Sequence, residues 1–452
     1  MQDNVTKHPQ WREMSPKALI PFVVFVIFYF GFSIATQDFS KVPMTVAFII
    51  SSATALILNH KEKLNKKIEV FALGMGNKDI MIMCLIFILA GAFASCASAT
   101  GAVDAAVQIA QYLVPSKYMI SGLFLISAFI SLSLGTSCGT IAAIVPIAVS
   151  LSQTIGINPA LAIGATVGGA MFGDNLSMIS DTTIASTRTQ NVEMRDKMLC
   201  NIKIVFVPAL VCALLYSLPF CVGSNAIPPT INLTLDMIIK TIPYFLLLVL
   251  GILGINVMFL LLIGIILNIL IGIYYNIFDI FQAFVYVGDG TVNMANTLIV
   301  ALLAGGLLMM VRYNGGITYI IHKTKNFIKG KKSCEVGICL LVGIINFFTA
   351  NNTVAIITAG PIAKELSQEY GVCPKRTASL LDTVSCCVQG VIPYGAQILI
   401  ATSLASSLSL SSFSIMKSLY YPPLMFIGVL ISLFFASDKK KDEMLTNVTK
   451  LK

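Results

Sequence analysis

A polar interruption inside an apolar run decides how this sequence folds. Residues 118–154 are apolar except at their centre, where residues 135–140 read GTSCGT. A second apolar run, residues 335–364, is interrupted in the same way by TANNT at residues 349–353. Non-helical backbone at membrane depth survives only where protein or a water-filled cavity surrounds it. Since each half looks short for a bilayer core of about 30 Å, we expect two re-entrant hairpins, each entering and leaving on one side.

The composition of the whole chain is that of a membrane protein. Of its 452 residues, 56% are hydrophobic and 11% are charged, whereas soluble domains carry about 25% charged residues. A soluble enzyme, a disordered chain and a secreted disulfide scaffold are therefore excluded. Ten further apolar runs are predicted to cross the bilayer as helices: residues 18–36, 42–58, 80–100, 159–188, 202–222, 236–252, 254–275, 296–312, 377–402 and 416–436.

The basic residues indicate an orientation for these spans. If the hairpins do not cross, 26 of the 30 Lys and Arg residues fall on one side, which marks that side as cytoplasmic. The net charge of +9 thus reflects membrane topology and not nucleic-acid binding. We expect a bacterial inner-membrane protein with cytoplasmic tails at 1–17 and 437–452. Residues 188–203 fall in an inner loop and residues 276–295 in an outer segment.

The two halves of the chain align at one constant offset. PIA at 146–148 recurs at 361–363, and LSQ at 151–153 recurs at 366–368. The hairpins and the helix pairs before them follow the same shift. Each half then has five crossings and one hairpin, and because five is odd, the second half is inverted. We predict an all-α fold of two inverted repeats, 18–224 and 225–436, the architecture of secondary transporters.

The helix after each hairpin is predicted to be broken. The centre of 159–188 reads GDNLSMISDTT at residues 173–183, and the centre of 377–402 reads QGVIPYGAQ at residues 389–397. Such a density of Gly, Pro, Ser and Asn implies an unwound segment whose freed carbonyls suit a hard cation such as Na⁺. The partners predicted in these segments are Asn175, Gln389, Tyr394 and Gln397.

Acidic residues at membrane depth mark the predicted ion site. Asp174, Asp181 and Asp382 are the only carboxylates within the spans and away from loops. A charge at the bilayer centre costs about 3 kcal/mol or more, so each must hold a cation or a proton. Competition between Na⁺ and a proton for one carboxylate is the chemical basis of antiport. We expect no Lys or Arg in the inner spans, and we expect the second hairpin tip to contribute Asn351, Asn352 and Thr353.

The first-half motifs resemble those of a known family. GTSxGT at 135–140 and FGDxLSxxSDTT at 172–183 are similar to the NhaC-type Na⁺/H⁺ antiporter family of the ion transporter superfamily. The resemblance covers about residues 20–435 and implies scaffold and transport regions, paired hairpins and often a homodimer. The site residues that it implies are Thr136, Ser137, Thr140, Asp174, Ser177, Ser180, Asp181 and Thr182. The chain departs from the family pattern at Cys138, Asn175 and Met178, where Trp, Lys and Pro are common.

Two transport functions remain open at this stage. The first is Na⁺/H⁺ antiport by alternating access, with Na⁺ and H⁺ as the transported ions and no cofactor. The alternative is Na⁺-coupled transport of a small organic solute, an amino acid or a carboxylate, held by the hairpin tips. An intramembrane enzyme is disfavoured, because His8, His60 and His322 all fall in loops and leave neither an HExxH site nor a Ser–His pair.

Overall fold

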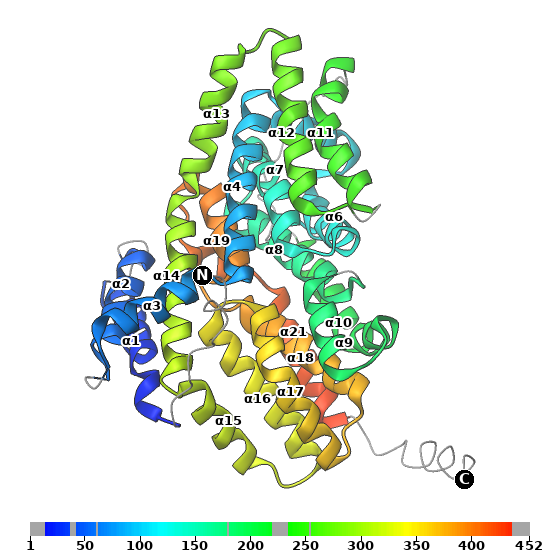
Figure 1. The fold of residues 1–452 in the computed structure, drawn as a ribbon. Coiled ribbons are helices and arrows are strands. Elements are labelled where there is room, and N and C mark those ends of the chain that lie inside the picture. Colours follow the sequence, from blue (N-terminus) through cyan, green and yellow to red (C-terminus); the bar gives the residue numbers. More distant parts are fainter. Residues whose placement is uncertain are drawn as a thin grey trace.

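The computed structural model describes residues 14–36, 42–59, 62–178, 180–218, 234–252 and 255–435. All regular structure in these residues is helical (Figure 1). The basic tail predicted at 437–452 lies outside the described residues, and so do most of the tail at 1–17 and the predicted boundary at 224/225.

The described helices are divided between the two halves of the chain. The first half holds α1 (Ile20–Ala35), α2 (Met44–Ile57), α3 (Leu64–Met75), α4 (Lys78–Ala99), α5 (Ala102–Leu113), α6 (Met119–Leu134), α7 (Ser137–Ile155), α8 (Pro159–Leu176), α9 (Asp181–Gln190) and α10 (Met194–Tyr216). The second half holds α11 (Leu235–Ile252), α12 (Val257–Tyr274), α13 (Ile280–Asn293), α14 (Ala295–Tyr313), α15 (Gly316–Phe327), α16 (Lys331–Thr349), α17 (Asn352–Tyr370), α18 (Pro374–Gln389), α19 (Ala396–Leu404), α20 (Ser412–Lys417) and α21 (Tyr421–Phe435). Among the described helices, six are long and apolar enough to cross a bilayer, namely α4, α7, α10, α12, α14 and α16.

Four helices occupy stretches that the sequence analysis left between spans. They are α3, α5, α13 and α15, and each has polar or charged side chains that break up an apolar run. The α13 helix occupies most of the predicted outer segment 276–295. Its acidic residue Asp279 caps the helix, since its carboxylate accepts from the backbone N–H of Gln282 at 2.7 Å. Asp279, an acidic residue of the segment expected on the outer side, therefore marks the start of a helix.

Each of the two interrupted apolar runs, 118–154 and 335–364, contains a two-residue turn between consecutive helices. Gly135 ends α6 with a left-handed φ of 68°, and Thr136 caps α7. In the second half Ala350 takes the left-handed position, and the side chain of Asn351 accepts from Val354 N–H at 3.0 Å. Because these caps let each helix run up to the tip, α7, α16 and α17 have 19 residues each. At 1.5 Å per residue this is about 28 Å, and since α7 and α16 are also apolar enough to cross a bilayer, the expectation that every half is too short to cross is wrong for these two helices.

The helices after the hairpins are interrupted where the residue pattern predicted. The α8 helix ends at Leu176 and α9 begins at Asp181, whereas α18 ends at Gln389 and α19 begins at Ala396. Both α8 and α18 lie in the protein interior, and residues 162–171 and 377–387 are buried throughout. The interruptions therefore lie deep inside the molecule.

Glycines let neighbouring helices approach at backbone distance. A Cβ added to Gly173 of α8 would lie 2.1 Å from the carbonyl oxygen of Ala128 in α6. Gly74 of α3 meets Gly305 of α14, and Gly290 of α13 meets Gly91 of α4. In Figure 1 these contacts join α3 to α14 and α13 to α4. The contacts hold α8 against α6 and fix the peripheral helices on α4 and α14.

Gly290→Ala is expected to lower stability, whereas Gly288→Ala on the same helix is not. The Cβ at 290 would lie 2.3 Å from the Gly91 carbonyl oxygen, while the Cβ at 288 meets open space. Overpacking of this kind costs about 1–3 kcal/mol, and a helical Gly→Ala change without a clash gains about 0.5–1 kcal/mol. Thermal unfolding of the purified proteins in detergent measures both. Equal melting temperatures for the two variants would contradict the close α4–α13 contact.

Candidate functional site

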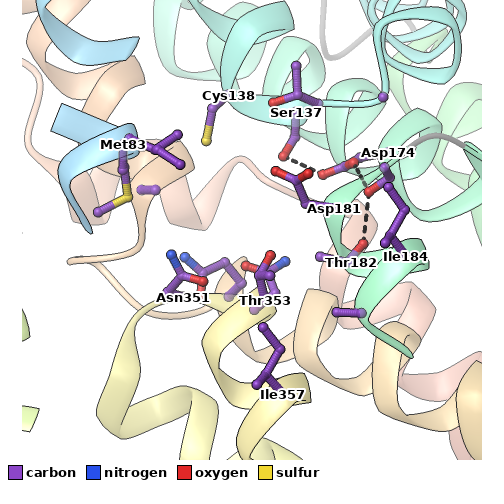
Figure 2. Close-up of a pocket in the computed structure, with 18 of the residues that line it drawn as sticks. Met83, Ser137, Cys138, Asp174, Asp181, Thr182, Ile184, Asn351, Thr353 and Ile357 are labelled. Carbon is purple, nitrogen blue, oxygen red and sulfur yellow. Dashed lines mark hydrogen bonds between the residues drawn. The ribbon is translucent and has the colours of Figure 1, made fainter. Parts of the chain in front are cut away.

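The hairpin tips and the interrupted helices meet at one central cavity. It has a volume of about 450 Å³ and is bordered by the tips at α7 and α17, the interruption between α8 and α9, and the starts of α4 and α19. Figure 2 shows Ser137, Asp174 and Asp181 on one side and Asn351 and Thr353 on the other. The predicted residues that line it are Thr136, Ser137, Asp174, Ser180, Asp181, Thr182, Asn351, Asn352, Thr353, Gln389 and Gln397.

Asp174 lies in the last turn of α8 and is held by two hydroxyls. Its Oδ2 accepts from Ser137 Oγ at 2.7 Å, and its Oδ1 accepts from Ser180 Oγ at 2.6 Å (Figure 2). Ser180 in turn contacts Thr182 Oγ1 at 2.9 Å. The carboxylate is buried, yet it borders the cavity. The two hydroxyl donors are neutral, so they stabilise the carboxylate without balancing its negative charge.

Asp181 stands at the other end of the interruption as the first residue of α9. Its side chain is exposed to the cavity, which it lines together with Asp174. A negative charge in the first turn of a helix is stabilised by the partial positive charge of the helix N-terminus. Helices α7, α17 and α19 also begin at the cavity. With α9 and the start of α4, five helix N-termini therefore border the space that the two carboxylates share.

Two buried amides each offer an oxygen atom without a hydrogen-bond partner. Gln397 Nε2 donates to Ser137 Oγ at 3.0 Å, and Gln389 Nε2 donates to the Ala350 carbonyl at 2.8 Å. Within the described residues, neither Gln389 Oε1 nor Gln397 Oε1 has a partner. Both side chains line the cavity and are almost fully buried. A buried acceptor without a donor is costly, and a hard cation accepts such oxygen ligands.

Five predicted residues do not line the cavity, and three of them, Thr140, Ser177 and Tyr394, have local structural contacts. Thr140 donates to the Thr136 carbonyl at 3.0 Å within the first turn of α7. The Tyr394 hydroxyl donates to the Phe347 carbonyl at 2.7 Å, and its ring lies against Phe25 and Phe48. Ser177 ends α8, and its carbonyl accepts from Thr183 Oγ1 at 2.7 Å. These contacts shape the tip and both interruptions without reaching the cavity.

The expectation that the inner spans carry no basic residue is wrong. Lys197 was assigned to an inner loop, but α10 begins at Met194 and carries Lys197 into the interior, where it forms an ion pair with Asp382. Asn175 Nδ2 donates to the same Asp382 oxygen at 3.1 Å. Neither Asp382 nor Asn175 lines the cavity. The exposed side chains of Lys78 and Arg188 do line it.

A periodic pattern could have revealed the buried lysine. Lys197, Asn201, Val205 and Pro208 recur at helical spacing, and all four are buried. Two polar residues followed by apolar ones on a single face indicate a helix that enters the protein interior. Assigning Lys and Arg residues to loops hides this pattern, because every basic residue near the end of a predicted span is then taken to be exposed to water.

A metal cofactor site is not found in the part of the chain that the structure describes. No group of three or more His, Cys, Asp and Glu side chains gathers there to hold a metal ion. The oxygen atoms at the cavity come from carboxylates, hydroxyls and amides on different helices. Such a mixed oxygen set suits a transported hard cation.

The fold and the cavity define a membrane transporter with interrupted helices at its centre. The family model described as "Na+/H+ antiporter family" matches residues 10–224 and 225–434. The chain therefore belongs to the Na⁺/H⁺ antiporter family and is a transporter, not an enzyme. Membrane embedding follows from this membership and from the apolar helices.

Characterised and uncharacterised antiporters are similar to the chain at low identity. An uncharacterised Na⁺/H⁺ antiporter of Haemophilus influenzae is 22% identical over 317 residues, covering 62% of this chain and 67% of that protein. The Na⁺/H⁺ antiporter NhaC of Alkalihalophilus pseudofirmus is 25% identical over 188 residues, 40% of each chain. The malate-2H⁺/Na⁺-lactate antiporter of Bacillus subtilis is 27% identical over 157 residues, 34% of this chain and 33% of that protein. The NhaC-type resemblance is thereby confirmed.

Cys138 is expected to react with a small water-soluble thiol reagent much faster than Cys387. Cys138 lines the cavity and is partly exposed, whereas Cys387 is buried in α18. Two variants that each retain one of these cysteines, treated with a methanethiosulfonate reagent and analysed by mass spectrometry, give the comparison. We expect at least a tenfold difference in rate. Equal rates would contradict a water-accessible cavity at the α7 tip.

Proposed function

We propose that this chain exchanges Na⁺ for protons by alternating access, with Asp174 and Asp181 as the exchanging carboxylates. The observation that carries the proposal is the cavity itself. Two carboxylates from the ends of one helix interruption line it together with Gln389 and Gln397, whose buried amide oxygens have no hydrogen-bond partner within the described residues. These groups supply the negative charge and the oxygen ligands that a dehydrated Na⁺ requires.

Na⁺ and a proton would compete for the same carboxylate. When Na⁺ leaves, Asp174 keeps its hydrogen bonds from Ser137 and Ser180, none of which carries a positive charge. Burial of a carboxylate without a counter-charge favours its protonated form. Proton uptake would then accompany Na⁺ release, and Na⁺ binding would expel the proton. Ser180 and Thr182 would complete the ion site, with Thr136, Asn351, Asn352 and Thr353 at the hairpin tips.

The alternating mechanism rests on two inverted repeats, 18–224 and 225–436. Helix starts support this division, because those of α7, α8 and α9 recur at the same sequence offset in α17, α18 and α19. Each repeat would have five crossings, one re-entrant hairpin and one broken helix, 159–188 and 377–402. Because the second repeat would be inverted relative to the first, two equivalent routes would lead to the centre, one from each side of the membrane.

The two proposed routes would not be equally open. On one route α14 and α19 are joined by a hydrogen bond between Thr297 Oγ1 and Ser403 Oγ. The equivalent positions in the first repeat, Ile82 of α4 and Arg188 of α9, line the open cavity instead. Since the loop charges assign Lys78 and Arg188 to the cytoplasm, the structure would be open to the inside of a bacterial inner membrane. Both termini would be cytoplasmic, and the protein is expected to form a homodimer.

A second function is supported by the helix N-termini. Those of α4, α7, α9, α17 and α19 border the cavity, and such ends attract anions. A small organic carboxylate bound between the hairpin tips together with Na⁺ would be stabilised by the partial positive charges of these helix N-termini. One relative is named a malate-2H⁺/Na⁺-lactate antiporter. Na⁺-coupled movement of an organic carboxylate is therefore the alternative to simple ion exchange.

Replacement of either cavity carboxylate is expected to abolish exchange. In proteoliposomes with an acidic interior, Na⁺ added outside should dequench a pH-sensitive dye for the unaltered protein. Asp174→Asn and Asp181→Asn should lower this signal at least tenfold, because a neutral amide cannot exchange Na⁺ for a proton. Asp196→Asn is the matched control, since Asp196 is a partly exposed partner of Lys375 and lies outside the cavity.

The same vesicles separate the two candidate functions. Normal exchange by both cavity variants would overturn the proposed site. If the unaltered protein moves no protons with Na⁺ but accumulates a radiolabelled carboxylate when Na⁺ is present, the alternative function holds. Uptake of neither ion nor solute would exclude both.

A disulfide across the closed route is expected to stop transport reversibly. We consider a Thr297→Cys/Ser403→Cys variant in which the native cysteines are replaced. Oxidation should join α14 to α19, block the step that opens this route, and reduce exchange to a few per cent until a reductant is added. The control pair Ile82→Cys/Arg188→Cys lies at the matching place on the open route and should join far more slowly. Full activity of the oxidised first pair would show that α14 and α19 do not separate.

A further inference from the structure

Lys197 of α10 and Asp382 of α18 form an ion pair in the protein interior. The two side chains are 0% and 1% exposed, and neither lines the central cavity. Moving two charges out of water costs several kcal/mol per ion, which the attraction offsets only when further hydrogen bonds are present. The pair therefore requires a structural environment that supplies those bonds.

The ammonium group of Lys197 connects the two sides of the first helix interruption. Besides Asp382, it donates to the Asn175 carbonyl at 2.9 Å and to Thr183 Oγ1 at 2.7 Å. Asn175 is the neighbour of Asp174 at the end of α8, and Thr183 lies in the first turn of α9. A lysine has three donors, and all three are used here. One side chain thus fixes the spacing between the segments that carry Asp174 and Asp181.

The carboxylate of Asp382 receives two amides in addition to the ammonium. Asn201 Nδ2 donates to it at 2.8 Å, and Asn175 Nδ2 donates to it at 3.1 Å. Asn201 also donates to the carbonyl of Asn175 at 3.0 Å. The network joins α8, α9, α10 and α18 directly behind the cavity. The positive charge that balances Asp382 is therefore supplied by a side chain of the protein, Lys197.

We propose that Lys197 is a tethered internal cation and a positioning residue for transport. It neutralises Asp382, so that Na⁺ and protons act only on the carboxylates at the cavity, and it holds the two ends of the interruption in register. This inference rests on the proposed antiport and adds to it a residue that sets the ion stoichiometry. A buried ion pair is in itself weak evidence for a contribution to stability. The contacts of Lys197 with Asn175 and Thr183, on the two sides of the interruption, connect the pair to the transport site instead.

The test uses a single and a double substitution in proteoliposomes. The measured quantities are the KM for Na⁺ and the ratio of protons to radiolabelled Na⁺ moved. Lys197→Met removes the tether and leaves Asp382 without its cation, so we expect the KM to rise at least tenfold and the ion ratio to change. Lys197→Met/Asp382→Asn removes both charges, so the ratio should return to its original value while the KM stays raised.

A matched control joins the same two helices. Asp196 of α10 pairs with Lys375 of α18 at 2.7 Å, and both side chains are partly exposed. Exposed pairs contribute about 0–1 kcal/mol, so Lys375→Met should change neither quantity. Thermal unfolding of each purified variant records folding separately from transport, and the double variant remains informative if Lys197→Met alone does not fold.

Two results would overturn the inference. The first is an unchanged KM and ion ratio in the Lys197 variants, which would reduce the pair to a structural element. The second is a double variant that moves Na⁺ without protons, which would make the pair itself the proton carrier. The failure of the proposed antiport is distinguishable from both, because the unaltered protein would then show no proton movement with Na⁺.

Discussion

The structure depends on the need to satisfy negative charge in the interior of an apolar protein. Asp174 is buried at the border of the cavity, and the hydrogen bonds that its carboxylate accepts come from nearby segments. A continuous α-helix uses its backbone groups internally. An interruption releases them and brings Ser180 back to the carboxylate, while the α7 tip brings Ser137. The hairpins, the interruptions and the glycine contacts with α6 all serve this arrangement.

The sequence allowed the interruptions and much of the cavity lining to be predicted, because both depend on local chemistry. Small polar residues within an apolar run have few explanations, and eleven of the predicted residues line the cavity. The carboxylates Asp174 and Asp181 lie where their spacing placed them, at the two ends of the first interruption.

The features that sequence reasoning missed depend on tertiary contacts. Lys197 resembles a loop lysine until α10 carries it against Asp382, which belongs to the other half of the chain. The helices α3 and α13 have too many polar residues for an apolar-run criterion, and backbone contact at Gly74 and Gly290 holds them in place. The helices α7 and α17 were expected to be shorter, because the apolar-run criterion did not recognise Thr136 and Asn351 as the caps at which these helices begin.

The hydroxyl of Tyr394 makes the two halves of the molecule unequal partners. It ties the second interruption to the α16 backbone, and its ring lies on Phe25 of α1 and Phe48 of α2. The matching position in the first half is Ile179, which has no group to donate. The second interruption is therefore anchored to α1, α2 and α16 through Tyr394, whereas the first interruption carries the two carboxylates that line the cavity, Asp174 and Asp181.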